Sequence, residues 1–188
     1  MLPRGWMVQL RNDERAYGWI SIGLHWLSFL MAVGLFAVGL YMVGLTYYDP
    51  LYHQLPEWHK LAGAGLALLT LLRLGWVLLN RPPPLLADSP WQRLMARGVH
   101  GVLYLLLLAL PITGYLITTA EGDALAAFNL TLLPAITTFD PHTVDWAGRL
   151  HLWSGWALIL VAAVHGLAAL KHHFLDRDTT LIRMLKSS

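Results

Sequence analysis

The stretch HLWSGWALILVAAVHG, residues 151–166, decides the fold that this chain can adopt. It contains no Asp, Glu, Lys or Arg, and it carries one histidine at its start, His151, and another near its end, His165. An apolar run of this length predicts a helix that is surrounded by protein or lipid. Fourteen helical residues rise about 21 Å and return to within about 40° of the starting direction, so the two imidazoles should share one face at two depths.

The composition indicates that lipid is the solvent for much of the surface. Of the 188 residues, 56% are hydrophobic and only 13% are charged, whereas an ordinary soluble domain has about twice that charged fraction. The length predicts one domain over residues 1–188. The absence of cysteine excludes disulfides, iron–sulfur clusters and covalent haem attachment. A net charge of +2 gives no indication of nucleic-acid binding.

Four stretches are long and apolar enough to cross a membrane, at about residues 19–45, 58–79, 98–119 and 150–171. Each can span a hydrocarbon core of about 30 Å. Inside lipid only a helix satisfies all the backbone groups within one segment. We therefore predict an all-α fold, an integral membrane four-helix bundle, in which Pro111 kinks the third helix.

The basic residues predict the orientation of the bundle. Only Lys60 and Arg149 lie at the outer ends of the spans. The other eleven of the 13 basic residues lie on the opposite side, in the N-terminal arm, in the second-to-third connection with its flanks, and in the tail: Arg4, Arg11, Arg15, Arg73, Arg81, Arg93, Arg97, Lys171, Arg177, Arg183 and Lys186. The positive-inside rule then places both termini in the cytoplasm.

Two connections have a distinct composition. The segment NRPPPLLADSP (80–90) is rich in proline and should be extended, with no helix. The outer connection, 120–148, contains the apolar segment ALAAFNLTLLPAITTF (124–139), which is too short and irregular to span. We expect this segment to lie on the outer membrane surface or to cover the outer end of the bundle.

Four histidines lie inside the spans or at their rims, at two matched depths. His59 and His151 share the outer level, and His25 and His165 share the inner level. Ionisable groups at membrane depth usually face the bundle interior and carry a function. Paired imidazoles from different helices suit a six-coordinate haem iron, whose filled axial positions favour electron transfer over oxygen chemistry.

Small residues near these histidines should make room for a macrocycle. Gly63 lies four residues after His59, Gly155 four after His151, and Gly166 directly after His165. Two alternatives to haem ligation stay open. Each histidine can serve as a helix–helix hydrogen-bonding residue, or the four can line a metal-ion transport path. A transport path would usually need carboxylates at membrane depth, and the first, third and fourth spans have none.

Three further histidines lie near the cytoplasmic side. His100 is close to the inner level, where it is a third candidate ligand or a polar group in a substrate pocket. His172 and His173 end the fourth span, as interfacial side chains or as proton donors to a nearby quinone. We expect a quinone site at this end, formed by His100, His172, His173 and Arg97.

The chain resembles the bacterial cytochrome b561 family and, more distantly, the di-haem membrane subunits of nickel-iron hydrogenase and formate dehydrogenase. The resemblance covers almost the whole chain. It rests on SIGLHWLSFL (21–30), WHKLAGAGLALLTLLRL (58–74), RGVHGVLYLLLLALPITGYL (97–116), HLWSGWALILVAAVHGLAALKHHF (151–174) and DTTLIRML (178–185), in the order and spacing of the family.

The resemblance implies a di-haem cytochrome b of the bacterial inner membrane. Its first and fourth helices would ligate the cytoplasmic haem b through His25 and His165. Its second and fourth helices would ligate the periplasmic haem b through His59 and His151. The family passes electrons between a quinone near the cytoplasmic haem and a partner at the outer side.

Two electron donors remain open at the outer side. Some small members resemble superoxide oxidases that reduce ubiquinone, and this chain lacks the extra span of the larger subunits. We therefore expect a superoxide:quinone oxidoreductase. The alternative is a cytochrome b subunit between a dehydrogenase or hydrogenase partner and the quinone pool. Lys60 and Arg149 should steer an anionic donor, pair with haem propionates, or do both.

Overall fold

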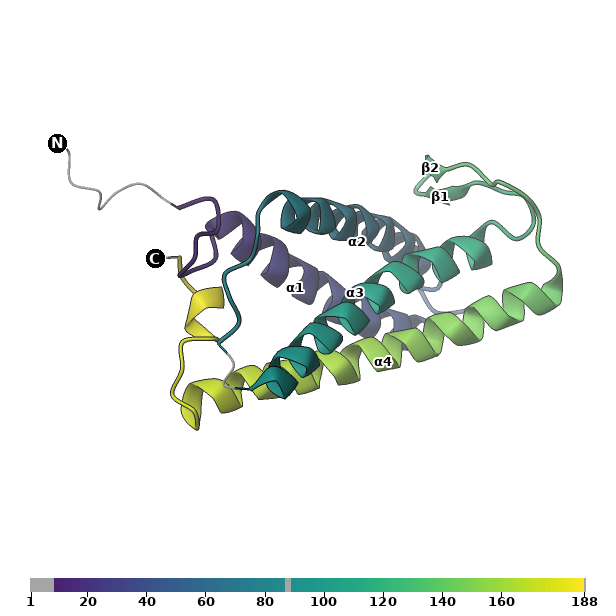
Figure 1. The fold of residues 1–188 in the computed structure, drawn as a ribbon. Coiled ribbons are helices and arrows are strands. Elements are labelled where there is room, and N and C mark those ends of the chain that lie inside the picture. Colours follow the sequence, from purple (N-terminus) through teal and green to yellow (C-terminus); the bar gives the residue numbers. More distant parts are fainter. Residues whose placement is uncertain (1–8, 87–88, 188) are drawn as a thin grey trace.

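The computed structural model describes residues 9–86 and 89–187. Four long helices account for most of them: α1 (Trp19–Met42), α2 (Gln54–Leu79), α3 (Pro90–Thr118) and α4 (Pro141–Phe174). All four are long and apolar enough to cross a membrane, so the predicted all-α membrane bundle is confirmed (Figure 1). Arg4 and residues 87 and 88 of the proline-rich segment lie outside the described residues.

The helices begin and end at different residues from the predicted spans. α1 ends three residues early, at Met42, whereas α2 begins at Gln54, α3 at Pro90 and α4 at Pro141, all outside the apolar windows. α3 and α4 both start with proline. Proline is tolerated there because the first backbone N–H groups of a helix have no acceptor within the helix. We expected no helix over residues 80–90. This is wrong for Pro90, which is the first residue of α3.

Capping explains why α3 and α4 start in the connections. The Ser89 hydroxyl accepts a hydrogen bond from the Gln92 backbone N–H at 3.2 Å, and the Gln92 side chain accepts from the Ser89 N–H at 3.2 Å. Asp140 caps α4 by accepting from the Thr143 N–H at 3.1 Å. Such side-chain caps satisfy backbone donors that have no partner inside the helix.

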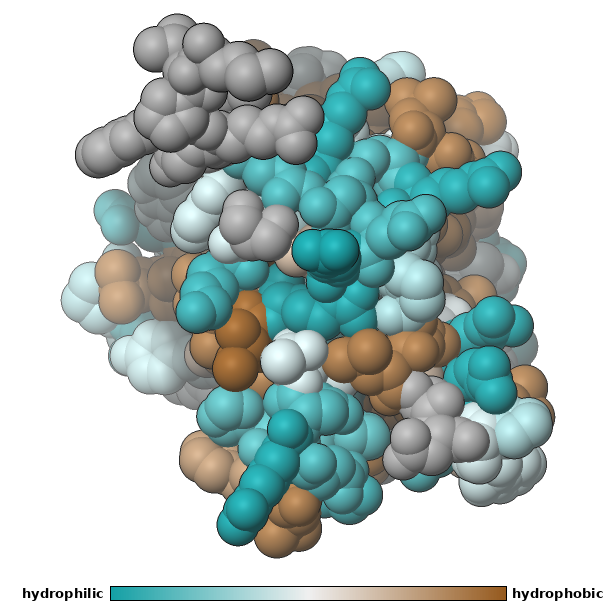
Figure 2. Space-filling view, turned by 60° about the vertical axis from the view of Figure 1, so that its left-hand side comes forward, coloured by the Kyte–Doolittle hydropathy of each residue, from teal (hydrophilic) through white to brown (hydrophobic). Residues whose placement is uncertain are grey.

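Both described ends of the chain lie at the same end of the bundle (Figure 1). The Ser187 hydroxyl donates to the Gln9 carbonyl at 3.4 Å, and the Trp26 indole N–H donates to the Met184 carbonyl at 2.7 Å. The short 3-10 helix η2 (Ile182–Met184) is thereby tied to α1. Hydrophilic side chains gather over the centre of this end of the molecule (Figure 2). The charge asymmetry makes it the cytoplasmic end.

A small leucine core lies between the two histidine levels. Leu66 and Leu69 of α2, Leu107 of α3 and Leu158 of α4 are buried against one another. Most other large apolar side chains on the helices are exposed, as expected for a bundle whose outer surface faces lipid. The core therefore separates the outer histidines from the inner ones by a layer of hydrocarbon.

The outer connection contains a β-hairpin, which holds the only β-strands among the described residues. β1 (Leu125–Ala127) pairs antiparallel with β2 (Leu130–Leu133). The Phe128 backbone N–H donates to the Glu57 carboxylate of α2 at 2.8 Å, and the Phe128 ring packs on Trp58 at 4.8 Å. Of the two placements expected for segment 124–139, these contacts support the one that covers the outer end of the bundle.

Candidate functional site

One face of α4 connects the two levels and the cytoplasmic end. His151, Leu158, His165 and His172 follow one another at intervals of seven residues. Seven helical residues return to within about 20° of the starting direction, so these four side chains form one stripe. Leu158 is buried in the leucine core between the two histidine levels. α4 therefore contributes to every candidate site on the inside of the bundle.

The outer level brings together the two histidines that the sequence paired. The rings of His59 (α2) and His151 (α4) have their centres 6.1 Å apart, at an interplanar angle of 67°. His151 Nδ1 lies 3.0 Å from both the Leu110 carbonyl oxygen and the Thr113 hydroxyl of α3. Because a carbonyl can only accept, Nδ1 carries the proton, and Nε2 is left as a lone-pair donor.

Two glycines outside the predicted set touch the outer rings. A Cβ atom on Gly39 of α1 would lie 3.3 Å from His59 Cε1, and one on Gly114 of α3 would lie 3.5 Å from His151 Cε1. The first distance is tighter than an ordinary contact, so Gly39 lets α1 pass close to the His59 ring.

The three glycines chosen from the sequence have different surroundings. Apart from the local helix backbone, no atom lies within 4 Å of a Cβ built on Gly63 or Gly166, so both positions border open space. That this space admits a macrocycle stays a prediction. Gly155 instead faces Phe36 of α1, whose ring would be 3.5 Å from the added Cβ. Gly155 therefore contributes to the packing of α1 on α4, and its role in making room beside His151 stays a prediction.

The inner level holds three histidines from three helices. The ring centres of His25 (α1) and His165 (α4) are 6.3 Å apart, and those of His100 (α3) and His165 are 5.2 Å apart. His100 is also exposed, whereas His25 and His165 are half-buried. The structure thus places His100 beside the inner pair, at a site that is accessible from outside the bundle.

The ring-centre separations of the His59–His151 and His25–His165 pairs fit an iron bound by two imidazoles. Metal–imidazole nitrogen bonds are about 2 Å long, so two rings on opposite sides of one iron have centres about 6 Å apart. The His59–His151 and His25–His165 separations meet this requirement, and the His100–His165 separation of 5.2 Å is about 1 Å too short. His59 Nδ1 is also a buried polar atom without a hydrogen-bond partner in the structure. The residues present therefore fit a haem at each level.

Arg73 of α2 is the principal residue that the sequence reasoning missed. It was placed among the cytoplasmic flanking cations, but its Nη2 lies 3.0 Å from His25 Nδ1. Its guanidinium also lies 5.3 Å from the centre of the Tyr104 ring. An arginine within an apolar span could have signalled this position, because charges at membrane depth usually face the bundle interior.

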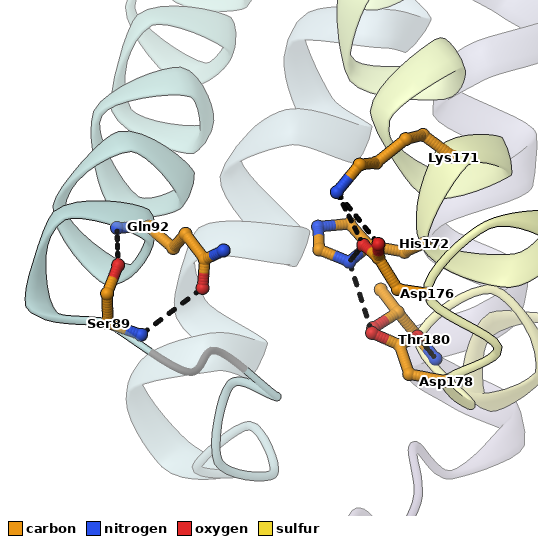
Figure 3. A network of polar contacts seen from close by, with 7 residues as sticks. All are labelled: Ser89, Gln92, Lys171, His172, Asp176, Asp178 and Thr180. Carbon is orange, nitrogen blue, oxygen red and sulfur yellow. Dashed lines mark hydrogen bonds and ion pairs between the residues drawn. The ribbon is translucent and has the colours of Figure 1, made fainter.

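The cytoplasmic end of α4 borders a cavity with a polar cluster (Figure 3). His172 Nδ1 lies 2.9 Å from Asp176 Oδ2 and 3.1 Å from Asp178 Oδ2, and Lys171 donates to Asp176 at 2.7 Å. The cavity has a volume of about 570 Å³, and its lining is Leu85, Leu86, Gln92, His172, Asp176, Asp178 and Thr179. Of the four residues predicted for a quinone site, only His172 is part of this lining.

The other predicted quinone residues are not part of this lining. His173 has a buried Nδ1 without a hydrogen-bond partner in the structure, and its ring packs on Phe174 at 4.8 Å. Arg97 is exposed on α3, and His100 contacts His165 instead. The predicted group therefore divides into His172 in the lining, His100 in ring contact with the inner pair, and His173 and Arg97, which belong to neither set.

The two outer cations differ in their surroundings. Lys60 is half-buried and forms an ion pair with Glu57, the carboxylate that also holds the hairpin. Arg149 is exposed, and its guanidinium lies 5.8 Å from the Trp146 ring. Much of the Lys60 charge is therefore compensated within the protein, whereas the described part of the chain gives Arg149 no ion pair.

Known proteins resemble this chain over almost its full length. The family model described as prokaryotic cytochrome b561 matches residues 16–187. The chain belongs to the prokaryotic cytochrome b561 family. Cytochrome b561 homolog 2 of Escherichia coli is 46% identical over 182 residues, with 96% of this chain and 97% of the relative covered. The probable superoxide oxidase CybB of Yersinia pestis is 31% identical over 177 residues, with 92% and 97% covered. Cytochrome b562 of Cereibacter sphaeroides is 28% identical over 181 residues, with 93% and 98% covered.

Membership of the cytochrome b561 family establishes the general activity. The protein is a multi-pass membrane electron-transfer protein of the bacterial inner membrane that binds haem b. Within residues 9–86 and 89–187, no group of three or more His, Cys, Asp or Glu side chains is arranged to hold a metal ion. The alternative of a His-lined metal-ion transport protein thus gains no support from the structure.

Proposed function

We propose that this cytochrome is a superoxide:quinone oxidoreductase with two haem b groups. The observation that carries the proposal is the pair of histidine sites stacked along α4, with ring-centre separations of 6.1 and 6.3 Å. Each site fits one bis-imidazole haem. The outer site is next to the hairpin end, and the inner site lies on the cytoplasmic side, where His172 borders a cavity.

The ligands in this proposal are His59 and His151 at the outer level, and His25 and His165 at the inner level. A haem b held by either pair would supply reversible one-electron storage. The leucine core places buried apolar side chains between the two levels. His59 and His151 would hold the haem on the donor side, and His25 and His165 would hold the haem on the quinone side.

The overall reaction balances with two donors per quinone. Two superoxide anions each lose one electron and become dioxygen, and one ubiquinone gains two electrons and two protons to form ubiquinol. Within this scheme Arg149 attracts the anion to the outer level by its local positive potential, and Lys60, which is paired with Glu57, contributes less. The pairing of these cations with outer haem propionates is a compatible second role.

We place the quinone headgroup at the open cavity beside His172. Its volume of about 570 Å³ is in the range of small-molecule sites. His172 reaches it from the α4 stripe that also carries His165, two turns deeper. Asp176 and Asp178 flank the His172 imidazole and connect it to the cytoplasmic surface, so the three side chains can pass protons to the quinone.

A second candidate function is electron transfer from a redox protein partner. The two outer segments, residues 46–60 and 120–149, together contain six acidic and only two basic residues. Glu121, Asp123 and Asp145 line an outer cavity of about 360 Å³. A negative outer surface repels superoxide at long range and attracts a basic protein, which favours the subunit-type alternative that the sequence left open.

Visible spectroscopy of the purified cytochrome separates these functions. Superoxide added without quinone should produce the sharp bands of two reduced bis-histidine haems, and ubiquinone added afterwards should reoxidise both. Reduction by superoxide that is no faster than reduction by a control without superoxide would reject the oxidase. Reduction that requires a partner protein would support the second candidate.

A further inference from the structure

Arg73 carries a positive charge inside the membrane bundle next to the inner histidine pair. It lies six residues before the cytoplasmic end of α2 at Leu79, and its side chain is half-buried. Its guanidinium contacts the His25 Nδ1 atom at 3.0 Å and lies over the Tyr104 ring at 5.3 Å. The charge therefore points to the inner level and away from the lipid.

No carboxylate of the described residues forms an ion pair with Arg73. The neighbouring Tyr17 does not supply a counter-ion, because burial raises the pKa of its phenol and keeps it neutral. A charge at membrane depth is costly unless an opposite charge or hydrogen-bond acceptors compensate it. The protein itself thus leaves Arg73 with one imidazole nitrogen and an aromatic face.

Ligation of iron by His25 changes this contact. An arginine can only donate, so the 3.0 Å contact requires His25 Nδ1 to be the acceptor. A neutral imidazole that binds iron through Nε2 carries its proton on Nδ1. The Arg73 N–H and the His25 Nδ1–H, both donors, would then face each other. The Arg73 guanidinium therefore needs a different acceptor at the same level of the bundle.

We propose that Arg73 binds a propionate carboxylate of the inner haem and holds the potential of this haem above that of an equivalent site without the cation. The proposal rests on the proposed function, in which His25 and His165 hold that haem. A carboxylate supplies the missing opposite charge and accepts two N–H donors from the planar guanidinium. The retained positive charge favours the reduced haem, which has one positive charge fewer on its iron.

The test uses purified protein with both haems bound, and compares Arg73→Gln and Arg73→Lys with the wild type. Arg81→Gln is the matched control, because Arg81 is an exposed arginine just beyond the cytoplasmic end of the same helix. Redox titration should show a lowered inner-haem midpoint potential in Arg73→Gln. The electron distribution between the haems should shift toward the outer haem by about tenfold or more. Arg73→Lys should restore most of the potential, and Arg81→Gln should leave it unchanged.

Infrared redox difference spectra give a second, more direct measurement. Protein that carries haem with ¹³C-labelled propionates identifies the carboxylate bands, and one inner-haem band should move in both Arg73 variants. Unchanged potential and unchanged propionate bands in Arg73→Gln would overturn the inference. Equal loss of the inner haem in Arg73→Gln and Arg73→Lys would also count against a role of the charge. Failure of the proposed function is distinguishable. A wrong haem assignment would leave the wild type without two bis-histidine haems, and a wrong electron donor would abolish reduction by superoxide without changing the effect of the Arg73 variants on the inner-haem potential.

Discussion

The His151 imidazole and the Leu110 carbonyl of the neighbouring helix α3 are joined by a hydrogen bond of 3.0 Å. The bond fixes the proton on Nδ1 and orients the ring, so Nε2 points away from α3 as a free donor atom. Outer hydrogen bonds of this kind commonly set the tautomer and the basicity of metal-binding histidines. α3 therefore takes part in the outer site without supplying a proposed ligand there.

Replacement of single proposed ligands should remove one haem at a time. His59→Ala or His151→Ala should leave about one haem per chain, the inner one, and His25→Ala or His165→Ala should leave only the outer one, because one axial bond alone holds the macrocycle weakly. Haem content by pyridine haemochrome and the number of low-spin signals in electron paramagnetic resonance measure this result.

His100→Ala is the matched control for the inner level. The His100–His165 ring separation is too short for an iron between them, so this variant should keep two bis-histidine haems. Two bis-histidine haems in the His25→Ala protein would show instead that His100 is the inner ligand.

Gly39→Ala should disturb the outer haem more than Gly114→Ala. The new methyl group would lie 3.3 Å from His59 Cε1 in the first variant and 3.5 Å from His151 Cε1 in the second, where the contact is ordinary. The gain in helix propensity is the same in both, about 1 kcal/mol at most. We expect a shifted outer-haem resonance signal and lower haem retention only in Gly39→Ala, and identical spectra of the two variants would contradict this expectation.

Neutralisation of the outer cations should slow haem reduction by superoxide, with Arg149→Gln more damaging than Lys60→Gln. The reason is that Glu57 already compensates Lys60. Stopped-flow rates at several salt concentrations measure the effect. If Arg149 dominates the local field, the wild-type rate falls with added salt and Arg149→Gln weakens that dependence. A wild-type rate that rises with salt would show that the outer carboxylates dominate.

Asp178→Asn should slow quinone reduction several-fold while haem reduction by superoxide stays unchanged. Burial acts to raise the pKa of Asp178, but hydrogen bonds from Thr180 and the contact with His172 outweigh it and leave this pKa below the ordinary 3.8. The carboxylate is therefore ionised at neutral pH. Its stabilising contribution is present above the unfolded pKa and is lost as pH falls through the lower folded value.

Single-turnover reoxidation of the haems by ubiquinone, followed between pH 5 and 8, measures the Asp178 effect. Glu14→Gln is the control, because Glu14 is an exposed carboxylate on the same side of the membrane. Equal reoxidation rates of Asp178→Asn, Glu14→Gln and the wild type would remove Asp178 from the proton path.

The sequence predicted the parts of this protein that depend on position along a helix. The depths of His25, His59, His151 and His165 follow from helical rise and from the charge-free windows, and in the structure the ring centres lie 6.3 and 6.1 Å apart within the two groups. Their role as haem ligands stays a prediction. The orientation follows from the distribution of basic residues. Both predictions use only local geometry and composition. These are informative in a membrane because a spanning segment must be helical in lipid and because basic residues gather on the cytoplasmic side.

Contacts between helices were less accessible to the same reasoning. Gly39 and Gly114 touch the outer rings from α1 and α3, and nothing in their sequence neighbourhood indicates which helix they approach. Arg73 could have been found, because it lies within a span. Its position near the helix end suggested a flanking cation instead. The ion pair with Glu57 reduces the role expected for Lys60 in attracting an anion, because Glu57 compensates the lysine charge. The sequence spacing of three residues, at which helical side chains of opposite charge pair, could have indicated this contact.

α4 is the common support of both histidine pairs, whereas α1 and α2 each carry one histidine of one pair. A tilt or a shift of α4 along its axis would therefore displace one ring of both histidine pairs at once, and the same movement of α1 or α2 would displace one ring of a single pair. The distance between the two histidine levels is set between His151 and His165 inside a single helix, where the backbone hydrogen bonds keep it constant. Changes in lipid thickness or in the loops can then displace the pair as a unit without altering the step between its members.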